Sequence, residues 1–256
     1  MKLTHARVLL TGASGGIGTA MTHALQQQGA HVMGVSRTPR DGPTSAWICA
    51  DLSQPEGIDT VAQAARQWEA NVVIHAAGQP LFGALAATSP SQSAALLQAN
   101  LWAPIALTQA LLPHLLAQPV ARVVFVGSAL GRIGVPGYSV YGASKAGLHG
   151  FAEALRRELH HTSLRVQLLA PRATQTAFND AAARRFAAAT GSATDSPARV
   201  AQELLSLLES DAAERFIGWP EKGMVRVNGV LGPWLDAGFA QHRKTLDATR
   251  LKGTLT

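Results

Sequence analysis

Short β-branched runs alternate with longer Ala- and Leu-rich stretches along the chain, and this alternation predicts the order of the elements. The predicted strands are 7–10, 30–36, 46–50, 71–76, 122–127, 164–170 and 214–218. The predicted helices are 16–28, which Gly29 closes, 54–68, 90–118, 138–161 and 197–209, followed by a weakly helical tail. Strands and helices therefore alternate over most of the chain.

The predicted strands are apolar along their whole length, which indicates a sheet covered by helices on both faces. Strand–helix alternation indicates parallel strands joined by right-handed crossovers. We therefore expect a single-domain α/β fold with a doubly wound parallel sheet of about seven strands. Residues 1–218 would form this domain, and 219–256 would be an apolar-basic helical extension of it.

Two segments interrupt this regular pattern. Pro104 lies within the predicted helix 90–118, and its missing N–H predicts a bend there. The segment 181–198 is rich in Ala, Ser and Thr, and we expect it to form a mobile surface helix and loop.

Composition narrows the class of protein. Apolar residues make up 47% of the 256 residues and charged residues 15%, which allows a buried core and is too little charge for disorder. Cys49 is the only cysteine, so no intramolecular disulfide can form. No apolar run is long enough to span a membrane, and the run after Met1 is too short for a signal peptide. We expect a soluble cytoplasmic protein.

A glycine-rich turn follows the first predicted strand and opens the first predicted helix. Glycine is needed where a turn takes a positive φ or where backbone approaches a ligand, and the N–H groups at a helix start can bind a pyrophosphate. An ordinary tight turn would explain only two of these glycines. The pattern predicts a Rossmann dinucleotide site whose residues include Gly12, Ser14, Gly15, Gly16, Ile17 and Gly18.

The end of the second predicted strand indicates which dinucleotide binds. NAD sites usually carry Asp or Glu there to hold the ribose hydroxyls, whereas this chain has Ser36 and Arg37. A guanidinium suits a 2′-phosphate dianion, so these residues predict NADP(H). The alternative is that Arg37 is a solvated surface residue.

Tyr141 and Lys145 are four residues apart and lie on the same face of the predicted helix 138–161. A nearby cation lowers the pKa of a phenol, so Tyr141 could act as general acid in reduction or general base in oxidation. Ser128 ends the preceding strand, at the edge where α/β sheets bind ligands, and could hydrogen-bond a carbonyl. Taken singly, Tyr141 and Lys145 could be ordinary neighbours on a helix surface, and Ser128 could be a helix cap.

Together these motifs resemble those of the classical short-chain dehydrogenase/reductase (SDR) family over nearly the whole chain. The matching residues are Thr11, Gly12, Gly16 and Gly18 of its TGxxxGxG turn, Asp51 and Leu52 of its adenine contact, its helical Asn100, its active-site Ser128, and Tyr141 and Lys145 of its YxxxK motif. Their order, spacing and strand or helix context all agree with the family.

The resemblance implies roles for the catalytic residues. Ser128 would polarise a substrate carbonyl, and Tyr141 would donate the proton. Lys145 would lower the pKa of Tyr141 and hold the nicotinamide ribose, while Asn100 would order a water in a proton relay to Lys145. The cofactor would supply the hydride.

One departure from the family follows the fourth predicted strand. The family commonly has Asn-Asn-Ala-Gly, whereas this chain has His75, Ala76, Ala77 and Gly78. The last two positions, where small residues let the cofactor approach, are kept. We expect His75 to be a structural histidine and not an acid/base group.

The other departure follows the sixth predicted strand. The family's Pro-Gly is replaced by Pro171 and Arg172, and Arg172 would either lie on the surface or contact the cofactor or an acidic substrate group. The family's Thr beside the nicotinamide carboxamide or the pyrophosphate matches Thr174 or, with better spacing, Thr176.

In such enzymes the segments after the Ser and after the sixth strand form the substrate pocket, here 129–138 and 173–196. Their mostly small and apolar residues suggest a hydrophobic ketone or acyl chain, although each side chain could instead pack the helices. The candidate pocket residues are Ser128, Leu130, Ile133, Val135, Tyr138 and Phe178.

The C-terminal segment is apolar and basic. Residues 221–256 contain six basic and three acidic residues. Their net charge is therefore +3, which is half of the net charge of the whole chain, +6. Such a segment could lie on an anionic membrane, meet an acidic acyl carrier or cover a lipid-like substrate; it could also pack on its own domain or on a second subunit. We expect neither nucleic-acid binding, because no recognition motif is present, nor a metal site.

The sequence thus predicts an NADPH-dependent reductase, reversible as an alcohol dehydrogenase, of a small hydrophobic ketone or aldehyde. A 3-oxoacyl thioester reductase is the closest alternative. A catalytically silent NADP(H)-binding sensor and a membrane-peripheral binding protein are alternatives of other classes. The resemblance also implies a homodimer or homotetramer, because the helices near Asn100 and Tyr141 pair between subunits in many relatives.

Overall fold

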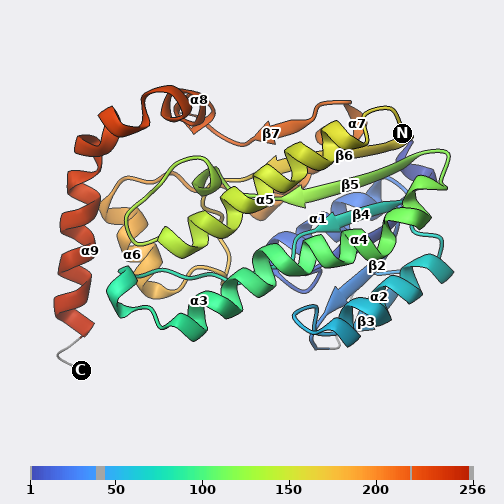
Figure 1. Ribbon diagram of the computed structural model, residues 1–256, viewed down its shortest axis with the longest axis horizontal. Helices are drawn as coiled ribbons and strands as arrows, with labels where there is room; N and C mark the ends of the chain where they lie inside the picture. Colours follow the sequence, from blue (N-terminus) through green and yellow to red (C-terminus); the bar gives the residue numbers. More distant parts are fainter. Residues whose placement is uncertain (1, 39–43, 220, 254–256) are drawn as a thin grey trace.

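The computed structural model describes residues 2–38, 44–219 and 221–253. Its centre is a parallel sheet of seven strands in the order β3-β2-β1-β4-β5-β6-β7 (Figure 1). The strands are β1 (Arg7–Thr11), β2 (His31–Ser36), β3 (Ala46–Cys49), β4 (Val72–His75), β5 (Ala121–Val126), β6 (Leu164–Ala170) and β7 (Glu214–Phe216). The single-domain parallel α/β fold predicted from the sequence is confirmed.

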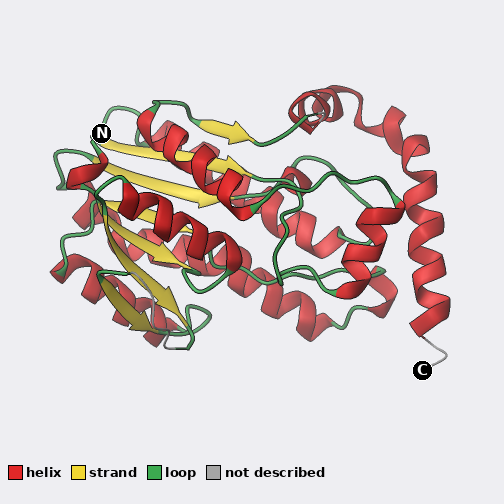
Figure 2. Ribbon diagram, turned by 180° about the vertical axis from the view of Figure 1, so that it is seen from behind, coloured by secondary structure: helices red, strands yellow, loops and turns green. Residues whose placement is uncertain are grey.

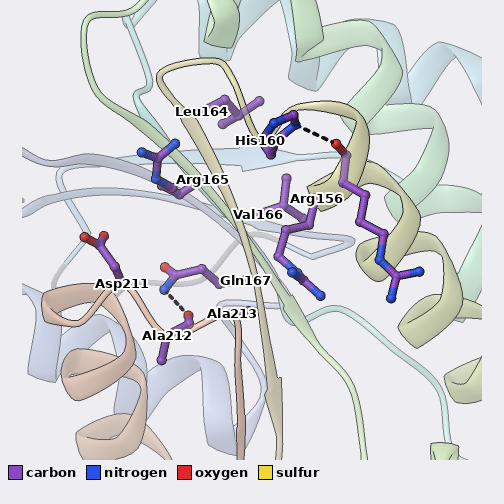
Figure 3. Close-up of a pocket in the computed structure, with 10 residues that line it drawn as sticks. Arg156, His160, Leu164, Arg165, Val166, Gln167, Asp211, Ala212 and Ala213 are labelled. Atoms are coloured by element: carbon purple, nitrogen blue, oxygen red, sulfur yellow. Dashed lines mark hydrogen bonds between the residues drawn. The ribbon is translucent and has the colours of Figure 1, made fainter.

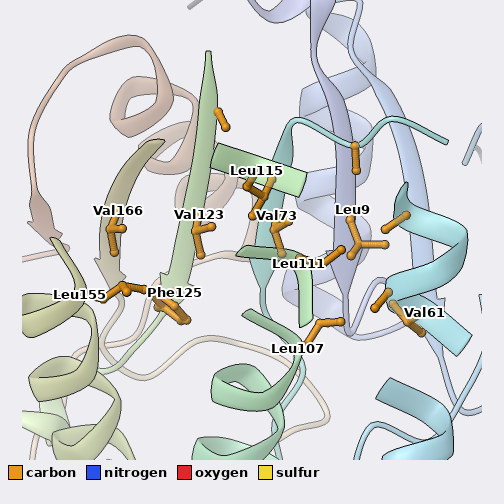
Figure 4. Packing of buried hydrophobic residues seen from close by; sticks show 14 of the residues in the cluster. Leu9, Val61, Val73, Leu107, Leu111, Leu115, Val123, Phe125, Leu155 and Val166 are labelled. Atoms are coloured by element: carbon orange, nitrogen blue, oxygen red, sulfur yellow. The ribbon is translucent and has the colours of Figure 1, made fainter. Parts of the chain in front are cut away.

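Helices cover both faces of the sheet (Figures 1 and 2). One face is covered by α2 (Pro55–Gln67), α4 (Ala103–Leu116) and α5 (Ser139–Glu158), and the other by α1 (Gly16–Gln27) and α7 (Pro197–Glu209). Successive strand residues point to opposite faces, so Val8 and Leu10 pack against α1 while Leu9 packs against α2 and α4. Figure 4 shows the second of these layers, where strand residues such as Val73 and Phe125 meet side chains of the covering helices.

The predicted helix 90–118 is divided into three parts. These are α3 (Pro90–Leu97), the π-helical segment η3 (Gln98–Trp102) and α4, which has Pro104 in its first turn. The bend predicted near Pro104 therefore corresponds to a π-helical segment just before the proline. Proline has no backbone N–H, so it cannot continue the series of helical hydrogen bonds. Asn100 lies inside this segment.

By length and composition, the helical run Pro90–Leu116 could cross a membrane; it is the one such segment in the described part of the chain. In this fold, however, Leu107, Leu111 and Leu115 are fully buried against the sheet. The apolar face of α4 therefore packs in the core of the fold.

Several short helical elements lie beyond the carboxyl ends of the strands, on the side where ligands bind in such sheets (Figure 1). They are η4 (Ala129–Gly131), α6 (Ala181–Ala189), α8 (Glu221–Leu231), the 3₁₀ segment η5 (Gly232–Phe239) and α9 (Ala240–Gly253). Helix α9 packs beside α6. The other short 3₁₀ turns are η1 (Leu3–His5) and η2 (Leu85–Ala87).

The prediction that 181–198 is a mobile surface segment is wrong in one respect. Ala183, Phe186 and Asp195 are all buried, although the residues between them are mostly exposed. Phe186 contacts Phe82 and Tyr138, and Asp195 pairs with Arg172. Aromatic packing and a buried ion pair thus hold this segment on the body of the protein.

Candidate functional site

A large cavity of about 1220 Å³ opens at the carboxyl ends of the strands. Every sequence-predicted site residue lines it except Asn100, which lies buried behind it. The predicted residues brought together are Gly12, Ser14, Gly15, Gly16, Ile17, Gly18, Ser36, Arg37, Asp51, Leu52, Ala76, Ala77, Gly78, Ser128, Leu130, Ile133, Val135, Tyr138, Tyr141, Lys145, Pro171, Arg172, Thr174, Thr176 and Phe178.

The glycines of the β1–α1 turn are required by close contacts. Gly12 has a φ of +70°, and a Cβ there would lie 2.7 Å from the Cα atom of Ala77. A Cβ on Gly18 would lie 2.1 Å from the carbonyl oxygen of Gly12, and one on Gly16 would lie 2.6 Å from Cγ2 of Thr176. Thr176 therefore lies directly against the turn.

Thr11 fastens this turn to the loop after β4. Its Oγ1 accepts hydrogen bonds of 3.1 Å from the backbone N–H groups of both Ala76 and Ala77. It donates a longer bond of 3.4 Å to the carbonyl of Ile74. These bonds order the loop without the two amide side chains that the family usually carries there.

The start of α1 fits a pyrophosphate. Gly15 is the N-cap residue and gives no side-chain cap, and the first turn carries no acidic residue. The first N–H groups of a helix have no intrahelical partner, and here Gly16, Ile17 and Gly18 line the cavity. An anionic group of a dinucleotide can therefore cap this helix.

The adenosine end of the cavity holds Ser36, Arg37, Asp51 and Leu52. The Asp51 carboxylate accepts hydrogen bonds from the N–H and hydroxyl of Ser53, at 3.0 and 2.8 Å. These bonds hold the pKa of Asp51 below its ordinary value, and the positive charge of Arg37 acts in the same direction. A fixed carboxylate and a guanidinium thus share this end of the cavity.

Ser128 is held by three hydrogen bonds. Its N–H donates to Nε2 of His149 at 3.4 Å, and its carbonyl accepts from the N–H of Gly131 at 3.0 Å. Its Oγ accepts from the N–H of Leu130 at 3.2 Å. Because the oxygen already accepts a bond, the hydroxyl proton can be donated to a substrate carbonyl.

Tyr141 and Lys145 face the same cavity, as predicted, with the Lys145 Nζ 5.9 Å from the centre of the Tyr141 ring. The ammonium donates to the carbonyl of Val126 at 3.0 Å, and burial lowers its pKa to about 8. Burial raises the pKa of Tyr141 to about 12, although the Ser128 hydroxyl acts to lower it. The expected lowering of the Tyr141 pKa by Lys145 is therefore not found in this structure, because desolvation of the phenolate dominates and the only lowering effect comes from Ser128.

Asn100 holds the loop after β4 and makes no direct contact with the cavity. Its Oδ1 accepts from the N–H of Gln79 at 2.7 Å, and its Nδ2 donates to the carbonyl of Gln79 at 3.0 Å. A Cβ on Gly78 would lie 3.1 Å from Oδ1 of Asn100 and 3.8 Å from Nζ of Lys145. Gly78 thus leaves room for both polar groups.

His75 is structural, as predicted. It is buried, its Nε2 hydrogen-bonds to Oγ1 of Thr108 at 2.9 Å, and its ring stacks on Phe125. Burial lowers its pKa to about 3, so it is neutral at physiological pH.

Arg172 does not take the surface role considered above. Its side chain is 12% exposed and makes two hydrogen bonds of 3.0 Å to Asp195, while Nη1 donates to the carbonyl of Trp219. Gly218 leaves room for the guanidinium, since a Cβ there would lie 2.8 Å from it. Arg172 therefore lines the cavity as part of an internal ion pair.

The substrate end of the cavity has an aromatic wall that the sequence showed only in part. Tyr138 contacts both Tyr141 and Phe186, with ring centres 6.1 and 6.2 Å apart. Among the cavity-lining residues that sequence reasoning missed are Phe82 and, from the C-terminal segment, Met224, Phe239 and His242. No local motif marks these positions, because only the chain's path across the cavity places them there.

A second cavity of about 410 Å³ lies elsewhere and shares no residue with the first (Figure 3). It is bounded by the end of α5, β6 and the segment before β7. Three arginines, Arg156, Arg157 and Arg165, line it together with Asp211. It contains none of the residues that the sequence predicts to be functional.

Comparison with known proteins agrees with this geometry. The model of the short chain dehydrogenase family matches residues 6–185. Uncharacterized oxidoreductase YbbO of Escherichia coli is 34% identical over 189 residues, or 70% of each chain. Among solved structures, a short chain dehydrogenase from Burkholderia cenocepacia in complex with NADP has a TM-score of 0.81 at 22% identity, covering 94% of this chain and 99% of that one.

A second solved structure shares the fold with a different cofactor bound. The 3-ketoacyl-(acyl-carrier-protein) reductase from Brucella melitensis, complexed with NADH, has a TM-score of 0.75 at 21% identity, covering 86% of this chain and 99% of that one. The family model covers most of the chain. The chain therefore belongs to the short-chain dehydrogenase family and is an oxidoreductase of that type.

Proposed function

We propose that this protein is an NADPH-dependent reductase of hydrophobic ketones or aldehydes. The observation that carries the proposal is the meeting of Ser128, Tyr141 and Lys145 at the floor of a cavity whose other end is walled by aromatic and aliphatic side chains. When bound, the nicotinamide cofactor supplies the hydride.

The protein's own residues supply position and a proton. The hydroxyl of Ser128 polarises the carbonyl, and the protonated Tyr141 phenol donates to the carbonyl oxygen as it gains negative charge. A pKa of about 12 keeps Tyr141 protonated at neutral pH, as a proton donor in reduction must be. The Lys145 ammonium, 5.9 Å from the centre of the Tyr141 ring, would stabilise the developing phenolate and would hold the nicotinamide ribose.

The preference for NADPH rests on Arg37, which lines the adenosine end of the cavity with no acidic residue beside it in β2. A solved relative with NADP bound supports this choice, whereas the NADH complex of another shows that the fold accepts both. The exposed Cys49 is compatible with a reducing compartment, which supports a cytoplasmic protein. We also propose a homodimer or homotetramer, as in many family members.

The test is oxidation of NADPH and of NADH by the purified protein, over a panel of aldehydes, ketones and 3-oxoacyl thioesters. Tyr141→Phe is the control, since it keeps the ring and removes the proton. We expect turnover with NADPH on apolar carbonyls, lost by about 10²- to 10⁴-fold in the control while NADPH affinity stays within a few-fold. Preference for the thioesters would favour the 3-oxoacyl alternative, and NADPH binding without turnover on any carbonyl would favour a sensor.

A further inference from the structure

His149 lies next in line after the catalytic pair on α5. Tyr141, Lys145 and His149 are each four residues apart, so all three lie on the helix face that meets the carboxyl end of β5. Unlike the other two, His149 does not line the cavity. It is 2% exposed and packs against the loop that carries Ser128.

Two glycines make room for the imidazole on either side of Ser128. A Cβ on Gly127 would lie 2.4 Å from Nε2 of His149, and one on Gly131 would lie 3.0 Å from the same atom. Neither glycine has a positive φ, so the backbone conformation does not require them. The imidazole requires the space at Gly127. At Gly131 a Cβ would also lie 2.9 Å from the backbone of Lys145, so that glycine is required by helix α5 as well as by the ring.

The ring makes one directional contact with this loop. Nε2 accepts the backbone N–H of Ser128 at 3.4 Å. An accepting Nε2 carries no proton, so the proton of the neutral ring is on Nδ1. Nδ1 is buried and has no hydrogen-bond partner among the described residues. An unpaired buried donor costs free energy, so Nδ1 does not stabilise this ring orientation. The Nε2 hydrogen bond and the packing on Phe216 maintain it.

The ring's surroundings keep it neutral. Burial lowers its pKa to about 3, and the positive charges of Arg132 and Lys145 act in the same direction. A protonated imidazole would lose its acceptor and repel Lys145. The Nε2 lone pair is thus available to Ser128 over the whole working pH range.

We propose that His149 is a positioning residue for Ser128: its neutral imidazole receives the Ser128 N–H and so fixes the hydroxyl that meets the carbonyl. The inference rests on the proposed function, because it assigns Ser128 to the carbonyl. With the N–H anchored by His149 and the Oγ and carbonyl anchored within η4, the serine has one remaining direction for its hydroxyl proton.

The test compares two substitutions in the full-length protein. His149→Gln keeps an acceptor near the place of Nε2, whereas His149→Leu fills the space without one. We expect His149→Leu to lower kcat by about tenfold or more while KM and NADPH affinity stay within about threefold, since misplacement of a catalytic group is costly. His149→Gln should recover most of kcat. Equal losses in both variants, or none in the leucine variant, would overturn the proposal.

A double-mutant cycle tests whether the effect runs through Ser128. Ser128→Ala removes the hydroxyl, so adding His149→Leu to it should cause little further loss of kcat. Additive losses would show that His149 acts elsewhere and would overturn the proposal. If the wild-type protein turns over no carbonyl, the proposed function fails instead, and the contact itself is tested by spectroscopy.

That measurement is ¹⁵N NMR of the histidine-labelled wild-type protein, with His149→Gln to assign the signal. We expect a neutral ring protonated on Nδ1 and unprotonated on Nε2, with no titration between mildly acidic and alkaline pH. A proton on Nε2 would overturn the proposal whether or not the protein has a substrate, and so would an ordinary histidine titration. This readout also covers the case in which His149→Leu does not fold.

Discussion

The Arg172 guanidinium and the Asp195 carboxylate face each other with two hydrogen bonds of 3.0 Å, from Nε to Oδ2 and from Nη2 to Oδ1. The Asp195 side chain is 1% exposed. Arg172 also binds the carbonyl of Trp219, so the pair joins the loop after β6, the end of the α6–α7 connection and the chain entering α8. A bidentate buried pair of this kind fixes geometry as well as charge.

Removing the carboxylate should therefore leave a buried cation without its partner. We expect Asp195→Ala to lower the free energy of unfolding by about 3–5 kcal/mol, measured by chemical denaturation. Arg199 contacts the same carboxylate from a half-exposed position, so Arg199→Ala is the matched control and should cost about 1 kcal/mol or less. Equal losses in the two variants would contradict this assignment.

Arg37 should decide between the two nicotinamide cofactors. A guanidinium bound to a 2′-phosphate gives charge-assisted hydrogen bonds, so Arg37→Ala should weaken NADPH binding about 10- to 100-fold. NADH lacks that phosphate, and its affinity should change little. Fluorescence titration with NADPH and with NADH measures the two affinities. An equal loss of affinity for both cofactors would contradict a contact between Arg37 and the 2′-phosphate.

The pH profile of carbonyl reduction should have an alkaline limb set by Lys145. Tyr141, with a pKa of about 12, stays protonated through this range, whereas Lys145, with a pKa of about 8, loses its positive charge as pH rises. The rate constant kcat/KM should therefore be level at neutral pH and fall above about pH 8. In Lys145→Arg the residual activity should lack this limb, because a guanidinium stays charged. A rate that rises steadily with pH would contradict these assignments.

The glycine turn should tolerate no side chain at Gly18. A Cβ there would lie 2.1 Å from the Gly12 carbonyl oxygen, so Gly18→Ala must displace the turn that receives the pyrophosphate. We expect NADPH binding to fall by at least about tenfold, as when ligand-binding backbone is misplaced. Gly150, exposed in α5 with nothing within 4 Å of a Cβ, is the control. Gly150→Ala should keep NADPH affinity and add about 0.5–1 kcal/mol of stability.

Some of this structure follows from the sequence because its causes are local. The strand Leu164–Ala170 and the helix Pro197–Glu209 have their predicted bounds, since continuous apolar runs and a helix-starting proline act over a few residues. The meeting of Ser128 with Tyr141 and Lys145 also follows, because Ser128 comes just after the carboxyl end of β5 and the other two lie in the first turns of α5, the next long helix.

Other features depend on contacts between distant segments and could not be predicted. The buried position of Arg172 requires Asp195, 23 residues further on, and the raised pKa of Tyr141 results from the burial that folding creates. The π-helical turn around Asn100 and the fit of His149 between Gly127 and Gly131 likewise depend on packing between elements. No short sequence pattern carries this information.

The C-terminal segment has a consequence for how this enzyme could change its substrate. Met224, Phe239 and His242 face the cavity, yet they come after the last strand and take no part in the sheet or in the cofactor turn. Substitutions there would alter the far wall while leaving hydride chemistry intact. In evolutionary terms we expect substrate selectivity to be separable from reactivity, and exchanging residues 221–253 between homologues is a direct way to redirect it.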